Sequence, residues 1–255
     1  MNHASSMFEP TIPFGEPELM RASAYRLYLK ELDEDAAKTG VSSRIASLSP
    51  SLRADLSRFE ADGGSSEVLE VVAACVRHAK RVAIHLQLGD RVVPLTVFPE
   101  ERLVHCPLPM AHLLAQPLTE LRVLHVEPAL LRPPGDEASG LVGEPRLHSP
   151  LGPLLWELAM RGGRNELLPE IAGPAVYRVT PGLQLRSLPI PSTLPAALYR
   201  LRSQGATLSE MAEWPGLDRE RAIRLLNALY LQSGLMVSRS HPDAINESWK
   251  RKGAR

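Results

Sequence analysis

The stretch from Pro195 to Ser240 constrains the fold of this chain most tightly, because signals for the start and the end of helices follow one another at short intervals. Thr207 and Glu210 form a capping-box pattern, and Asp218 suits the N-cap of another helix. Three glycines stand where such helices would end: Gly205, Gly216 and Gly234. The pattern predicts three short helices and then a strand, at residues 196–202, 207–215, 218–233 and 235–237.

This order of elements resembles the three-helix core of helix-turn-helix and winged-helix domains. The resemblance covers residues 195–240 and rests on Ala-Thr-Leu-Ser-Glu-Met-Ala at 206–212 and on Leu-Leu-Asn-Ala-Leu-Tyr-Leu-Gln-Ser-Gly-Leu at 225–235. In such domains the third helix often lies in the major groove of DNA. The resemblance therefore implies that five side chains on this helix and just after it are candidate DNA contacts: Arg219, Arg221, Arg224, Asn227 and Arg239.

The charge of the chain favours a protein partner over DNA for this module. Lys and Arg together number 29, and so do Asp and Glu, so the chain has no net field that would attract a polyanion. Asp218 and Glu220 also place negative charge at the start of the third helix, where a phosphate would lie. We expect Leu231 and Ile223 to lie outside the buried face of this helix, where they would offer an apolar contact to a partner.

A stretch rich in proline and glycine, residues 132–152, separates two regions that are rich in apolar residues. Such a composition is typical of a linker between domains. We therefore predict an α+β domain at 19–131 and a mostly helical domain at 153–240 that ends in the winged-helix-like unit. The proline-containing residues 1–18 are predicted to be a flexible leader, and residues 241–255 a tail.

Patterns of both helix and strand alternate along the first predicted domain. Residues 67–80 have the wide apolar face of a buried helix. The β-rich runs 82–88 and 91–98 are separated by Gly89-Asp90, the spacing of a hairpin. Further helices are predicted at 18–33, 48–59 and 110–116, with strands at 103–106 and 121–126. This order is typical of an α+β layer domain, and beyond the linker a helix at 154–160 and a strand at 175–179 are predicted.

The sequence contains no recognisable catalytic motif. The patterns GxxxxGK[ST], GxGxxG, GxSxG and HExxH are all absent. Cys75 with His78, and His105 with Cys106, lack the paired spacing of a zinc site, so Cys75 is expected to be a buried apolar residue. His85 and His125 are expected to be structural. The sequence therefore predicts no enzymatic activity, no cofactor and no metal.

Three aromatic residues near the C-terminal end are expected in the core. Tyr199 and Tyr230 fall among leucines at helical spacing, and Trp214 would cover the turn between two helices.

Several observations together suggest a cytoplasmic protein with no membrane segment. The first residues lack the basic and apolar regions of a signal peptide, and the longest apolar run, Val71 to Val76, is too short to cross a bilayer. Two cysteines do not make a disulfide framework. Arginines greatly outnumber the five lysines, which suggests a GC-rich bacterial genome.

We therefore expect a non-enzymatic bacterial regulatory or adaptor protein that acts through protein contacts. The alternatives are a DNA-binding transcriptional regulator that uses residues 195–240, and an enzyme of unknown type.

Overall fold

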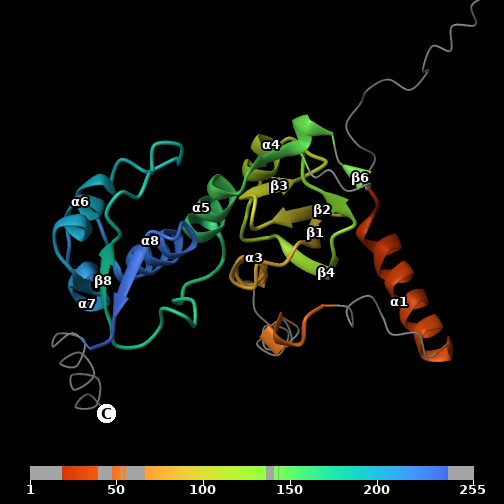
Figure 1. The fold of residues 1–255 in the computed structure, drawn as a ribbon, viewed down its shortest axis with the longest axis horizontal. Helices are drawn as coiled ribbons and strands as arrows, with labels where there is room; N and C mark the ends of the chain where they lie inside the picture. Colours follow the sequence, from red (N-terminus) through yellow and green to blue (C-terminus); the bar gives the residue numbers. More distant parts are fainter. Residues whose placement is uncertain are drawn as a thin grey trace, which may run out of the picture.

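The computed structural model describes residues 19–39, 48–52, 54–55, 67–135, 141–142 and 144–240 (Figure 1). The predicted leader and tail lie outside these residues. Helices and antiparallel sheets are both present, which confirms the predicted α+β class. Within the described ranges, no helix combines the length and the apolar character needed to span a membrane.

The first half is built on a five-stranded antiparallel sheet with the order β4-β1-β2-β3-β7. The predicted hairpin of β1 and β2 is confirmed, with the register running from Val82 opposite Val97 to Leu88 opposite Arg91. Gly89 in its two-residue turn has a φ of 60°, a left-handed conformation that glycine adopts without strain. The strands of the sheet are β1 (Val82–Leu88), β2 (Arg91–Phe98), β3 (Leu103–His105), β4 (Arg122–Pro128) and β7 (His148–Pro150).

The two faces of this sheet carry different side chains because neighbouring residues in a strand point in opposite directions. Ile84 belongs to the main core, to which α3 (Glu67–Arg77) contributes the predicted apolar face. On the opposite face, α1 (Ala22–Thr39) places the ring of Tyr25 against that of His85, with 4.9 Å between the ring centroids. The short α4 (Met110–Leu114) connects β3 to β4.

The described residues of the second half that follow Arg161 contain three helices and a three-stranded sheet with the order β10-β8-β9. The predicted capping box at the start of α7 is confirmed, and the Asp218 side chain accepts a hydrogen bond from the Arg221 amide at the start of α8. The elements are β8 (Val176–Val179), α6 (Pro195–Ser203), β9 (Ala206–Thr207), α7 (Leu208–Ala212), α8 (Arg219–Leu231) and β10 (Leu235–Ser238). The central strand β8 precedes α6 in the chain and pairs with both β9 and β10.

The predicted linker at 132–152 is wrong over its last residues. Strand β7 pairs with β3 at the edge of the first sheet, and α5 (Leu151–Arg161) follows it directly. An edge strand needs hydrogen bonds on one side only, so it tolerates proline, and Pro150 therefore does not mark a loop. The remaining elements of this stretch are β5 (Leu131–Arg132), β6 (Leu141–Val142) and a 3-10 helix, Pro145–Leu147.

A continuous hydrophobic core crosses the predicted domain boundary. One cluster of buried side chains includes Val72 from α3, Leu155 from α5 and Leu229 from α8. Helix α5 contacts α3 and also packs along α8, and Figure 1 shows it between the five-stranded sheet and α8. Its Trp156 is fully buried, and the indole Nε1 donates a hydrogen bond of 3.3 Å to the Pro189 carbonyl. The two halves therefore share one helix and one core.

Candidate functional site

Helix α8, for which the resemblance implies DNA contacts, is buried by other parts of the chain on two of its sides. Asn227 is fully buried: its Nδ2 donates to the Glu166 carbonyl and its Oδ1 accepts from the Leu168 amide, both at 2.9 Å. Leu231 and Ile223 are 3% and 6% exposed. The expectation that Asn227 and Leu231 contact DNA or a partner is therefore wrong, because these side chains pack inside the protein.

Arg224 also faces another part of the protein. Its Nη1 donates to the Met160 carbonyl at 2.9 Å, and its Nη2 donates to Asn165 Oδ1 at 3.1 Å and to Glu220 Oε1 at 2.8 Å. The bonds to Met160 and Asn165 connect α8 to the C-terminal end of α5 and to the loop after it. The predicted contact role of Arg224 would require breaking them.

The remaining three predicted contacts are exposed but do not form one free basic surface. Arg239 Nη2 donates to the carbonyl of Glu170 at 2.7 Å and to that of Ala172 at 3.3 Å. Arg221 Nη1 donates to the Gly216 carbonyl at 3.2 Å. Arg219 is exposed at the first turn of α8, beside the acidic Asp218 and Glu220. The expected set of six residues is therefore divided between the interior and separate surface positions.

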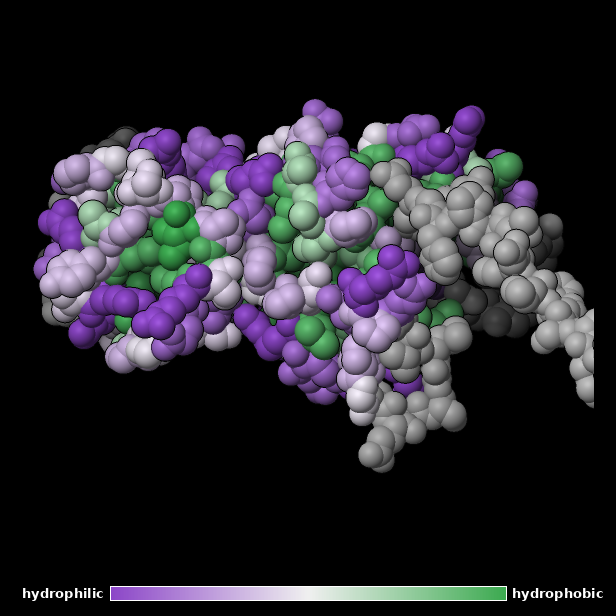
Figure 2. Space-filling view, turned by 90° about the horizontal axis from the view of Figure 1, so that it is seen from above, coloured by the Kyte–Doolittle hydropathy of each residue, from purple (hydrophilic) through white to green (hydrophobic). Residues whose placement is uncertain are grey.

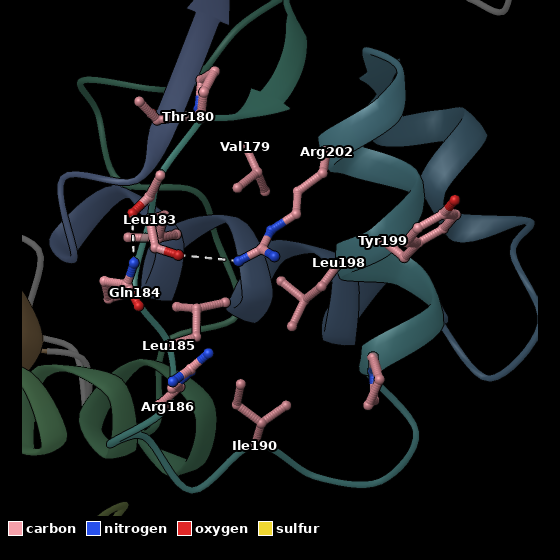
Figure 3. A pocket seen from close by; sticks show the side chains of 13 residues that line it. Val179, Thr180, Leu183, Gln184, Leu185, Arg186, Ile190, Leu198, Tyr199 and Arg202 are labelled. Carbon is pink, nitrogen blue, oxygen red and sulfur yellow. Dashed lines mark hydrogen bonds between the residues drawn. The ribbon is translucent and has the colours of Figure 1, made fainter.

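A pocket of about 650 Å³ lies between α6 and the chain segment that leaves β8 (Figure 3). We call it the α6 pocket; it is lined by residues 179–186 and 190 and by four residues of α6. These four share one face of the helix because they are three or four positions apart. They are Pro195, Leu198, Tyr199 and Arg202.

The interior of the α6 pocket is apolar. Val179, Leu185 and Leu198 are buried, and Leu183 and Ile190 are half-buried. Figure 2 shows apolar side chains in a hollow between hydrophilic ones on this C-terminal part of the molecule. The pocket can therefore shield apolar atoms of a ligand from water.

The rim of the pocket carries an exposed aromatic side chain. Tyr199 is 74% exposed, so the expectation that it lies in the core is wrong. Tyr199 borders the pocket, and Figure 3 shows its ring extending from α6 away from Leu185 and Arg186 on the opposite wall. Trp214, in contrast, is 9% exposed, in keeping with its expected place in the core, and the Arg200 guanidinium lies 4.7 Å from its ring centroid.

A hydrogen bond and a glycine hold the wall of the pocket in place. Arg202 Nη2 donates to the Leu183 carbonyl at 3.0 Å, which connects α6 to the opposite wall. Leu183 packs directly over Gly234, where a Cβ atom would approach Leu183 Cδ2 to 2.3 Å. A Cβ atom at Gly234 would displace the Leu183 side chain, so the glycine permits this close approach. The periodic spacing of the α6 residues is the sequence signal that could have indicated the pocket, but its other wall has no regular pattern.

Two histidine–carboxylate pairs lie elsewhere and do not line the α6 pocket. His78 Nε2 lies 2.7 Å from Asp55 Oδ2, and His85 Nε2 lies 3.1 Å from Glu127 Oε1. The described residues contain no group of three or more His, Cys, Asp or Glu side chains that could hold a metal ion.

The two cysteines are buried and do not form a disulfide. Burial raises the pKa of Cys75 to about 12 and that of Cys106 to about 11. Both thiols are therefore protonated at neutral pH and are poor nucleophiles. The burial of Cys75 confirms its prediction as a small apolar residue of the core.

Comparison of the chain with protein-family models, with curated proteins and with solved structures finds no match.

Proposed function

We propose that this chain is a non-enzymatic adaptor or regulatory protein that binds another protein at the α6 pocket. The observation that supports this most strongly is the combination of an apolar interior with an exposed aromatic side chain, Tyr199, on the helix that lines the pocket. Tyrosine and arginine are enriched at the energetically important centres of protein interfaces. The lining contains no histidine, cysteine or carboxylate, which are the side chains most often used in acid-base and nucleophilic catalysis.

Affinity capture with matched variants tests this proposal. The purified chain is immobilised as wild type, as Tyr199→Ala and as Leu130→Ala, and each is exposed to an extract of the cells that express it. Leu130 is 66% exposed and does not line the pocket, so it controls for general apolar stickiness. We expect a protein that is enriched at least tenfold by the wild type and by Leu130→Ala but not by Tyr199→Ala. A partner that all three forms capture equally would argue against the α6 pocket as the binding site.

The contacts of α8 disfavour the alternative of a DNA-binding regulator. Arg224 and Asn227 are already bonded to the protein, and acidic residues flank Arg219. We therefore expect no binding to random-sequence duplex DNA in a fluorescence anisotropy titration at low salt. Binding that weakens steeply with salt and disappears in the double variant Arg219→Ala, Arg221→Ala would instead support the regulator.

A further inference from the structure

The α6 pocket carries positive charge without a balancing carboxylate. Of the side chains that line it, Arg186 and Arg202 are charged, and none is acidic. Among the residues that the structure describes, neither arginine forms an ion pair. Building on the proposed function, we infer that the pocket binds an acidic, apolar segment of the partner protein. A large apolar side chain would enter the pocket while a neighbouring carboxylate contacts the two arginines.

The apolar part of this recognition follows from the shape and the lining of the pocket. Leu185, Leu198 and Ile190 present side chains from two walls, as Figure 3 shows. Ligand pockets in proteins commonly enclose about 300–1,000 Å³, and the volume of about 650 Å³ lies within this range. The pocket therefore has room for the side chain of a leucine or a phenylalanine together with part of the adjoining backbone.

The polar part follows from the position of Arg202. Its hydrogen bond to the Leu183 carbonyl holds the guanidinium across the pocket, as drawn in Figure 3. A guanidinium has five N–H donors and its plane matches a carboxylate, so donors remain for a ligand after this bond is made. Because Arg202 is already held, little further side-chain entropy is lost when a carboxylate binds. Arg186 lies on the same segment as Leu185 and supplies the second positive charge.

Labelled peptides of known chemistry test this inference directly. The first peptide contains leucine and phenylalanine with aspartate and glutamate, the second replaces each carboxylate by its amide, and the third replaces each apolar residue by serine. Binding is measured by fluorescence anisotropy with a rhodamine label. We expect the wild type to prefer the first peptide over each of the others by about tenfold or more.

Variants of the arginines decide whether the preference arises in the α6 pocket. Arg186→Gln and Arg202→Gln are each expected to remove most of the preference for carboxylate over amide, whereas Leu130→Ala keeps it. Arg202→Lys keeps the positive charge but loses the planar guanidinium that can bind a carboxylate through two N–H groups. This variant should therefore keep part of the preference for carboxylate over amide. Arg202→Gln removes both the positive charge and the hydrogen bond to the Leu183 carbonyl. The structure describes no hydrogen bond for Arg186. Arg186→Gln therefore tests the loss of the charge without the loss of a bond that supports the fold.

The outcomes separate this inference from the proposed function. Equal binding of the acidic and amide peptides, or an unchanged preference in both glutamine variants, would overturn the inference. If Tyr199→Ala still abolishes capture of a partner in that case, the proposed function survives. If decanoate binds with the same dependence on Arg186 and Arg202 while no peptide binds, the ligand is a small amphiphilic carboxylate and both proposals fail.

Discussion

At the scale of single residues, buried polar side chains fix the path of the second half of the chain. Asn227 bonds two backbone groups of the loop after α5. Arg164 forms an ion pair with Glu70 of α3, and both are 8% exposed. The guanidinium of Arg164 also donates to the carbonyls of Glu166 and Leu167 at 2.8 and 2.7 Å. Irregular backbone that is buried in this way keeps its hydrogen bonds only through such side chains.

Replacing the amide of Asn227 should therefore lower stability markedly. Asn227→Ala leaves the buried Leu168 amide without its partner and removes one of the two donors to the Glu166 carbonyl, the other being Arg164. We expect a loss of about 1–3 kcal/mol in the free energy of unfolding. Urea denaturation followed by circular dichroism measures this loss. The exposed control Arg219→Ala should change stability by less than about 0.5 kcal/mol. If Asn227→Ala lost no more stability than Arg219→Ala, the Asn227 amide would not contribute to stability.

The stripe that contains Asn227 also shows a limit of prediction from sequence. Ile223, Asn227 and Leu231 are four positions apart, so they share one face of α8, and all three are buried. The periodicity of the other apolar residues indicates a single buried face, as expected for a helix on the surface. Because a second layer of chain covers this stripe, α8 is buried on two sides. The residues that cover it lie about 60 positions earlier, as Leu168 does, and the local pattern does not reveal them.

His105 should make stability depend on pH. Burial lowers its pKa and the nearby His148 lowers it further, against an opposing effect of Glu144. A lowered native pKa means that the unfolded chain binds the proton more readily, so the stabilisation is complete above about pH 6.5 and is lost as the pH falls below it.

The free energy of unfolding in urea at pH 7.5 and at pH 5.5 measures this effect. We expect His105→Gln to show a smaller decrease between these two pH values than the wild type. His112→Gln, at an exposed position, is the matched control and should keep the wild-type decrease. The same decrease in all three proteins would show that His105 does not contribute.

At the scale of the elements, helix ends were predictable and very short strands were not. The caps at Thr207 and Asp218 depend on neighbours three residues away, so the sequence contains the complete signal. Strand β9 has two residues and β7 has three, too few for an alternating pattern. The end of α8 also differs from the prediction: the helix ends at Leu231, and Ser233 takes the left-handed conformation that was expected of a glycine.

The capping box of α7 gives a prediction at this scale. Thr207 Oγ1 accepts from the Glu210 amide at 3.2 Å, and Glu210 Oε2 accepts from the Thr207 amide at 2.8 Å. Thr207→Ala should lower the free energy of unfolding by about 1–2 kcal/mol, whereas Thr207→Ser keeps the hydroxyl and restores most of it. Guanidinium denaturation of both variants measures the difference. Equal losses for alanine and serine would assign the effect to the lost methyl group.

At the scale of the whole molecule, α5 joins the two halves. The composition of residues 132–152 suggests two separate domains, but β7 and α5 connect them without an intervening loop. Proline and glycine in a sequence indicate only the local backbone conformation. The packing of α5 against both α3 and α8 depends on contacts between residues that are distant in the sequence. The α+β class was therefore predictable, and the continuity of the core was not. For the same reason the α6 pocket, with one irregular wall, was not recognised from sequence.

A shared helix and core should make the two halves unfold together. We expect the far-ultraviolet circular dichroism and the tryptophan fluorescence to give the same urea midpoint, with a single transition. Leu155→Ala, a truncation within α5, should shift both midpoints to lower urea by the same amount, because Leu155 is fully buried in the shared core. Two separated transitions would instead indicate independent domains.

The positions of the cysteines give the chain a built-in reporter of how often its interior opens. Cys75 and Cys106 both belong to the first half, whereas the buried Trp156 and Trp214 belong to α5 and the second half. Alkylating reagents require an accessible thiolate, and burial suppresses both access and ionisation in the native state. The rate at which iodoacetamide modifies the native protein therefore measures transient exposure of the first half, without any label being introduced.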